Sequence, residues 1–130
     1  VRGPLRGTAG LPNHVRLPAG PGWALVGDAG YHRDPVTGHG ITDAFRDAEL
    51  LAAALDSALR DDSPGCEAVA VGRYRRQRDL ALRATFDLTR QIAAFPAPDT
   101  FVGLQVRLSE ALETEALDLA SRPFRAATAA

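Results

Sequence analysis

A carboxylate and two glycines stand in an order that could bind a polar ligand. Asp28 follows Gly27 and the short apolar run of residues 23–26, which reads as a strand. Gly38 and Gly40 precede a long stretch rich in Ala and Leu. A carboxylate at a strand end can accept hydrogen bonds from hydroxyl groups, and glycines let a ligand approach the backbone. The following helix N-terminus adds unpaired N–H groups, so this order favours a ligand with hydroxyl or phosphate groups. An ordinary Gly-Asp turn is the open alternative.

Other residue types capable of chemistry are sparse. The histidines are His14, His32 and His39, and no two fall at the i, i+4 spacing that a helical metal site uses. With Cys66 as the single cysteine, the sequence predicts no zinc or other metal site and no disulfide within the chain. His32 and His39 flank the loop after Asp28, where a solvent-exposed loop histidine is favoured over one that faces a ligand. No catalytic residue can be assigned.

Three helices are expected to position these residues. The first follows Gly40 and ends near Asp61 and Asp62, the second covers about residues 67–95, and the third covers residues 100–119. The apolar residues of the first helix form one stripe: Ile41, Ala44, Phe45, Ala48, Leu51, Ala52, Leu55 and Leu59. Residues 14–17 are expected to pair with residues 23–26 as a short hairpin. The fold class expected for the isolated chain is therefore mostly α.

Four arginines crowd one part of the second helix, namely Arg73, Arg75, Arg76 and Arg78. A solvated face is favoured over an anion site. The 15 basic and 16 acidic residues of the whole chain nearly cancel, so the composition indicates neither a nucleic-acid nor a membrane partner. With one cysteine, no apolar run long enough to span a membrane and no signal peptide, a cytoplasmic location is expected. The absence of Met, even at position 1, suggests a C-terminal fragment of a longer protein.

The stretch VGDAGYHRDPVTGHGITDAFRDAELLAAAL resembles a motif of a known enzyme family. It is similar to the second FAD-binding motif of the flavoprotein monooxygenases related to para-hydroxybenzoate hydroxylase. The matching elements are Gly27-Asp28-Ala29, Pro35, Thr37-Gly38-His39-Gly40-Ile41 and Asp47-Ala48. The run from Tyr74 to Arg78 also resembles the Tyr-x-x-x-Arg segment that often follows in this family. Position 42 departs from the family pattern: this chain has Thr42, whereas the family usually has Asn.

The resemblance implies a division of the chain and a role for each matching residue. Residues 1–60 would be the C-terminal part of an α/β FAD-binding domain, and residues 61–130 a helical segment packed on it. Asp28 would hydrogen-bond the ribityl chain of FAD, and Pro35 would lie between flavin and substrate. The backbone at Ile41 and Thr42 would face the oxygen-bearing edge of the flavin ring. The implied cofactor-binding residues are Gly27, Asp28, Ala29, Pro35, Gly38, Gly40, Ile41 and Thr42.

The function implied by the resemblance is that of an FAD-dependent oxidoreductase. A monooxygenase using NAD(P)H and oxygen on a small organic substrate is expected, with a flavin-dependent reductase or halogenase as the alternative. A non-catalytic helical remnant is a third hypothesis. The family binds the ADP half of FAD with a G-x-G-x-x-G segment, which this sequence lacks. The expected partner is therefore the missing N-terminal part of the same protein, and residues 1–130 alone should neither hold FAD tightly nor be active.

Overall fold

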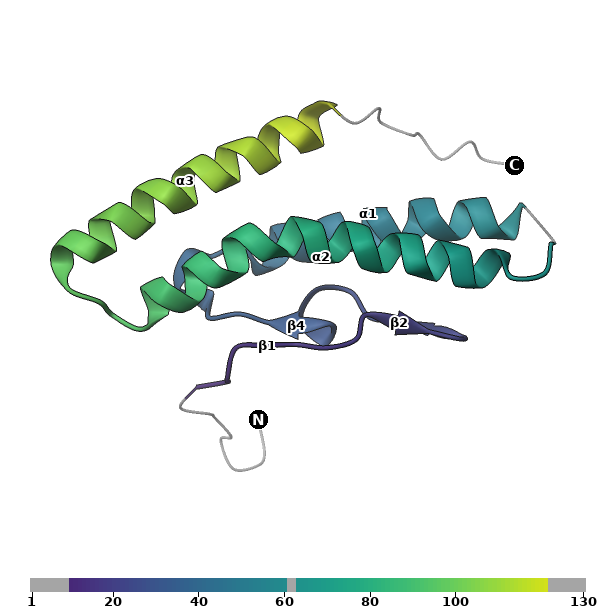
Figure 1. The fold of residues 1–130 in the computed structure, drawn as a ribbon, viewed down its shortest axis with the longest axis horizontal. Helices are drawn as coiled ribbons and strands as arrows, with labels where there is room; N and C mark the ends of the chain where they lie inside the picture. Colours follow the sequence, from purple (N-terminus) through teal and green to yellow (C-terminus); the bar gives the residue numbers. More distant parts are fainter. Residues whose placement is uncertain (1–9, 61–62, 122–130) are drawn as a thin grey trace, which may run out of the picture. The chain divides into compact units, whose positions relative to one another are not determined.

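The chain is built mainly from three long helices, as its sequence predicts. The computed structural model describes residues 10–60 and 63–121. Within them, α1 covers Gly40–Leu59, α2 covers Cys66–Ala93 and α3 covers Pro98–Ser121 (Figure 1). The first helix begins at the predicted glycine, and the other two differ from their predicted bounds by one or two residues. The predicted stop signals Asp61 and Asp62 lie outside the described residues. The mostly α fold class is confirmed.

Two short antiparallel pairings precede α1, and they differ from the predicted hairpin. Strand β2 (Ala19–Gly20) pairs with β3 (Trp23–Ala24) across a tight turn. Strand β1 (His14–Val15) pairs instead with β4 (Tyr31–His32), so the predicted pairing of residues 14–17 with 23–26 is wrong. The reason is local. A Pro-Gly turn with Gly22 at positive φ brings β3 directly back onto β2, which leaves β1 to pair with the segment that follows β3.

Helix α1 buries a different face from the one its sequence pattern predicts. The apolar stripe of α1 is largely exposed; Phe45, for example, is 74% exposed. The buried residues are Asp43, Arg46, Asp47, Leu50 and Ala54. Since amphipathic helices usually bury their apolar stripe, this reversal is the main departure from the sequence-based expectation.

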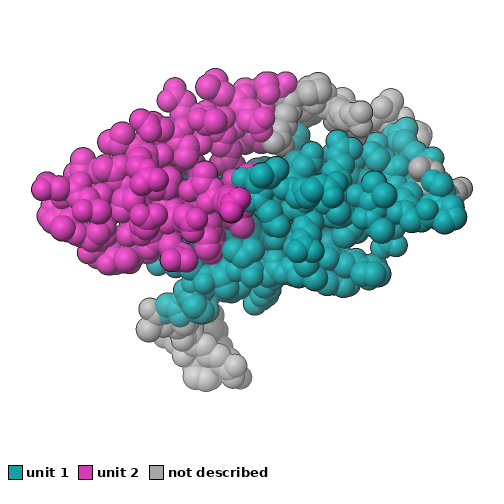
Figure 2. Space-filling view, in the orientation of Figure 1, with its two compact units in different colours: residues 1–80 teal, residues 81–130 magenta. Residues whose placement is uncertain are grey.

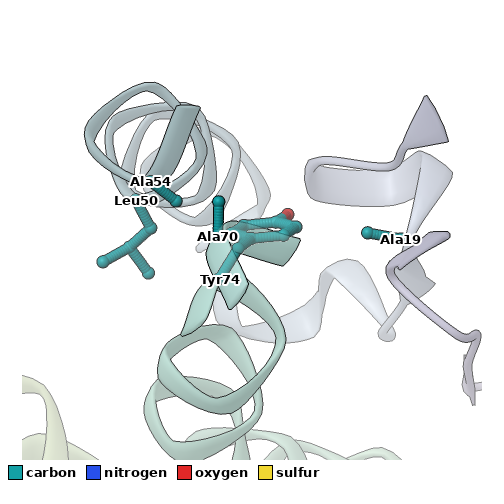
Figure 3. Close-up of a cluster of buried hydrophobic side chains, with 5 residues drawn as sticks. All are labelled: Ala19, Leu50, Ala54, Ala70 and Tyr74. Atoms are coloured by element: carbon teal, nitrogen blue, oxygen red, sulfur yellow. The ribbon is translucent and has the colours of Figure 1, made fainter. Parts of the chain in front are cut away.

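The second half of α1 packs on the first part of α2. Leu50 and Ala54 from α1 meet Ala70 and Tyr74 from α2, and Ala19 of β2 completes the cluster (Figure 3). Close packing is possible because three of the five side chains are alanines. The cluster therefore anchors both the β2–β3 hairpin and α1 on α2.

The chain forms two compact units, residues 1–80 and 81–130, which divide within α2 (Figure 2). In the second unit, Leu88 and Ile92 near the end of α2 form a buried cluster with Leu104 and Leu108 of α3. In the sequence, Tyr74, Ala81, Leu88 and Phe95 recur every seven residues with Val71, Thr85 and Ile92 alongside, a pattern that predicts packing on other helices. Leu88 and Ile92 belong to that pattern. Phe95, which extends that pattern, lies beyond the helix end with a positive φ and is exposed.

The sequence predicts no membrane-spanning segment. Across residues 10–60 and 63–121, no helix combines the length and the apolar character needed to cross a membrane. The division of the chain into part of an FAD-binding domain, residues 1–60, and a helical segment, residues 61–130, stays a prediction.

Candidate functional site

The Gly-Asp pair lies in a tight turn between β3 and β4. Gly27–Ala29 form one turn of 3-10 helix, closed by a 2.8 Å hydrogen bond from the Gly30 N–H to the Gly27 carbonyl oxygen. Gly27 has φ +52°, and a Cβ there would lie 2.8 Å from the Cβ of Ala44 on α1. Both the left-handed backbone and the close contact with α1 require glycine. The turn thereby presents Asp28, which is exposed, next to the start of α1. We call residues 25–30 the Gly-Asp turn.

The start of α1 leaves backbone donors without helical acceptors. Gly38 has a left-handed φ of 69°, which ends the preceding turn at Pro35–Thr37. The first helical hydrogen bond runs from the Asp43 N–H to the His39 carbonyl oxygen, over 3.0 Å. The N–H groups of residues 40–42 precede this bond and therefore have no acceptor within the helix. Together they form a partial positive charge at this end of α1.

A cleft of about 710 Å³ joins the Gly-Asp turn to the start of α1. Its lining is mostly apolar and consists of Asp28, His32, Arg33, Asp34, Pro35, Gly38, His39, Gly40, Ile41, Ala44, Phe45 and Ala48. A Cβ at Gly40 would lie 3.9 Å from Asp28 Oδ1, so the carboxylate stands beside the first residue of the helix. The cleft therefore combines one carboxylate, a row of backbone donors and an apolar wall.

The cleft brings together five of the eight residues that the sequence singles out. Asp28, Pro35, Gly38, Gly40 and Ile41 line it. The other three do not: Gly27 is buried within the turn, and Ala29 and Thr42 are exposed outside the lining.

Both loop histidines border the same cleft. His32 and His39 are half-buried, so the expectation of solvent-exposed histidines is wrong. The pairing of β1 with β4 explains the position of His32, because it places that ring 6.0 Å from the ring of His14. His39 immediately precedes α1. Because the start of that helix borders the cleft, His39 lines the cleft as well.

A network of buried charges ties α1 to the loop after the Gly-Asp turn. Arg33 Nη2 lies 2.6 Å from Asp43 Oδ2, and Arg46 Nη1 lies 2.9 Å from Asp43 Oδ1. Arg46 Nη2 donates a 3.0 Å hydrogen bond to the hydroxyl of Tyr31 and lies 3.4 Å from Asp47 Oδ1. Two arginines and two aspartates thus neutralise each other in a region without solvent access. Buried charges need such partners, because an unpaired charge there would be costly.

Asp47 connects this network to the Gly-Asp turn. Its Oδ2 accepts a 3.1 Å hydrogen bond from the N–H of Gly27. Burial raises the pKa of the Asp47 carboxyl above its ordinary value, while Arg46 and the Gly27 N–H act in the opposite direction. The carboxylate form is the one suited to accept both contacts.

Side chains of α2 also donate hydrogen bonds to the Gly-Asp turn. The Tyr74 hydroxyl donates a 2.6 Å hydrogen bond to the carbonyl oxygen of Leu25. One helical turn later, Arg78 donates to the carbonyl oxygens of Gly30 and Arg16, over 3.3 Å and 3.1 Å. Arg78 is only 1% exposed, so its interpretation as part of a solvated face is wrong, whereas Arg73, Arg75 and Arg76 are exposed as expected.

Sequence reasoning missed the buried roles of Arg33, Asp43, Arg46 and Arg78. For two pairs of residues, the sequence spacing did indicate a shared helix face. Asp43 and Arg46 are three residues apart on α1, and Tyr74 and Arg78 are four apart on α2, so each pair shares one helix face. The spacing alone does not say whether that face meets solvent or the interior of the protein.

The described residues contain no group of three or more His, Cys, Asp or Glu side chains placed to hold a metal ion. Comparison of the chain with protein-family models, with curated proteins and with solved structures found no match.

Proposed function

We propose that residues 23–60 form the flavin-facing part of an FAD site in an FAD-dependent oxidoreductase. The enzyme would be of the monooxygenase type and would use NAD(P)H and oxygen on a small organic substrate. The observation that carries this proposal is the Asp28 carboxylate beside the start of α1, in a mostly apolar cleft. FAD combines a hydroxyl-bearing chain with a flat ring that has an oxygen-bearing edge. A carboxylate next to a row of N–H donors is complementary to that combination.

The residues present fit such a ligand. A Cβ at Gly38 would meet no atom within 4 Å, and a Cβ at Gly40 would approach only Asp28, so both glycines leave room for a flat ring near the backbone. The cleft volume of about 710 Å³ lies within the range of small-molecule sites. Asp28 would accept hydrogen bonds from the ribityl hydroxyls, and Pro35 would lie on the substrate side.

The flavin, when bound, supplies the electron-transfer chemistry, and the chain supplies binding and electrostatics. The N–H groups at residues 40–42 would stabilise negative charge on the oxygen-bearing edge of the ring, because a helix N-terminus carries a partial positive charge. Ile41, Phe45 and Ala48 form an apolar wall of the cleft. That wall favours an aromatic ring over a fully polar ligand.

The exposed apolar stripe of α1 supports the partner that this function requires. Its members Ile41 and Phe45 also line the cleft, so the stripe continues from the site along the helix to Leu59. Large exposed apolar surfaces of this kind mark sites of interaction. We propose that polypeptide carrying the ADP-binding half of the FAD site covers this stripe and closes the cleft over the cofactor.

The test is the flavin content of residues 1–130 together with the polypeptide that carries the ADP-binding half, purified as the cell produces them, because residues 1–130 alone should not hold FAD tightly. Visible absorbance, and fluorescence of the flavin released on denaturation, would show about one FAD per chain. Replacement of Asp28 by Ala should weaken FAD binding by roughly ten- to a hundredfold, the usual effect of losing hydrogen bonds to a charged group. Oxidation of NAD(P)H coupled to oxygen consumption would then distinguish a monooxygenase from a reductase.

Asp87→Ala is the matched control, because Asp87 is an exposed acid on α2 outside the cleft. That variant should keep its flavin. A preparation that includes the ADP-binding half and still contains no flavin would contradict the proposed function, as would an Asp28→Ala variant that binds FAD as tightly as the Asp87→Ala variant.

A further inference from the structure

Two buried side chains, one on each of two helices, bind the backbone of the Gly-Asp turn on either side of Val26. The Tyr74 hydroxyl on α2 donates to the Leu25 carbonyl oxygen over 2.6 Å. The Asp47 carboxylate on α1 accepts from the Gly27 N–H over 3.1 Å. Both side chains have a relative exposure of zero. Neither borders the cleft, so neither can contact a ligand bound there.

A third buried side chain fixes the other end of the turn. The Arg78 guanidinium donates to the Gly30 carbonyl oxygen over 3.3 Å, and the Arg16 backbone N–H donates to the same oxygen over 2.9 Å. Arg78 is held in turn by Asp79, with Nε donating to Oδ1 over 2.8 Å, and its guanidinium lies 5.7 Å from the centre of the Tyr31 ring. The turn is therefore bound at three backbone groups within six residues.

Asp28 and Ala29 are the exposed residues between these attachment points, and Asp28 is the one that lines the cleft. We infer that Asp47, Tyr74 and Arg78 are positioning residues, which fix the Gly-Asp turn so that the Asp28 carboxylate points to the ligand. This inference rests on the proposed function and extends it to residues that do not touch the cofactor. A carboxylate on a short turn loses less entropy on binding when its backbone is already fixed.

Tyr74→Phe is the sharpest variant, since it removes one hydroxyl and keeps the buried ring. The FAD affinity of the purified protein should fall by roughly five- to tenfold, as expected for one neutral hydrogen bond. If Tyr74 acts through Asp28, the same change made in an Asp28→Ala background should alter affinity by less than about twofold. In hydrogen exchange, the Gly30 amide, which closes the turn, should exchange faster in Tyr74→Phe than in the wild-type protein.

Thr85→Val is the control, because Thr85 is a buried residue of the same helix whose hydroxyl donates to Leu82, in the other unit. It should leave both FAD affinity and Gly30 exchange unchanged. Additive effects of Tyr74→Phe and Asp28→Ala would overturn the positioning role even though flavin binds. A wild-type protein without flavin would instead defeat the proposed function. Unchanged Gly30 exchange in Tyr74→Phe would show that the hydroxyl does not fix the turn.

Discussion

At the scale of single residues, the site depends on polar groups that are buried and paired. Arg46 contacts both Asp43 and Asp47, and it donates to the hydroxyl of Tyr31. Breaking a buried pair usually costs more than forming it contributes, because the remaining charge is left without a partner. The network therefore fixes how α1 meets the loop, although buried ion pairs in general add little net stability.

The two tyrosines of the chain provide a prediction at this scale. Burial is the main cause that raises the pKa of Tyr74 to about 12 and the pKa of Tyr31 well above its ordinary value. Because the folded protein resists ionisation of these hydroxyls, their contribution to stability is complete below pH 10. It is lost as the pH rises from 10 through the raised values.

Tyrosinate absorbance should therefore appear together with the loss of helical circular dichroism during an alkaline titration. A separate tyrosinate transition near pH 10, with the helical signal intact, would contradict the burial of both hydroxyls.

At the scale of elements, α1 has two faces that both repeat with helical periodicity. The apolar stripe containing Ile41 and Phe45 is exposed, whereas Asp47, Leu50 and Ala54 are buried. The buried face is polar near the Gly-Asp turn, where backbone groups need partners, and apolar near α2, where Ala70 and Tyr74 are packed. One helix thus serves as a polar support and as part of a hydrophobic cluster.

Paired substitutions in α1 test this assignment. Leu50→Ala should lower the free energy of unfolding by about 2–3 kcal/mol, because Leu50 is 6% exposed and its loss leaves a cavity. Phe45→Ser should change it by less than about 0.5 kcal/mol, since Phe45 lies on the exposed face. Urea unfolding followed by circular dichroism measures both. Equal losses in the two variants would mean that the apolar stripe is buried within the chain.

At the scale of the whole molecule, the described chain has two compact units with separate hydrophobic clusters. The first cluster includes Leu50 and Tyr74, and the second includes Ile92 and Leu104. The Gly-Asp turn and the cleft lie entirely within the first unit. We therefore expect the candidate site to keep its structure when the second unit is destabilised.

Leu104→Ala tests this independence. The substitution should destabilise the second unit by about 2–4 kcal/mol, because Leu104 is buried among Leu88, Ile92 and Leu108. Hydrogen exchange followed by mass spectrometry should show lost protection in residues 81–121 and unchanged protection in the Gly-Asp turn. Equal loss of protection throughout would show that the chain unfolds as one unit.

The sequence by itself determined the three helices and the start of α1. Apolar periodicity, the glycines before residue 41 and the break at Pro96-Ala97-Pro98 are local signals, and each acts over a few residues. The order of Asp28, Gly38 and Gly40 also predicted which residues would lie close together, because a short turn and a helix start leave few arrangements. Of the eight residues that the family resemblance implies, five line the cleft.

Only the tertiary structure decided which strands pair, which face of α1 is buried and which charges are hidden. These outcomes depend on groups far apart in the chain, such as Tyr74 with Leu25 and Asp47 with Gly27. A hydrophobic pattern predicts burial of apolar side chains. It carries no information on the backbone groups of a distant turn, which need hydrogen-bond partners. Those backbone groups are satisfied by Asp47, Tyr74 and Arg78, and for that reason polar side chains occupy the interior around the Gly-Asp turn.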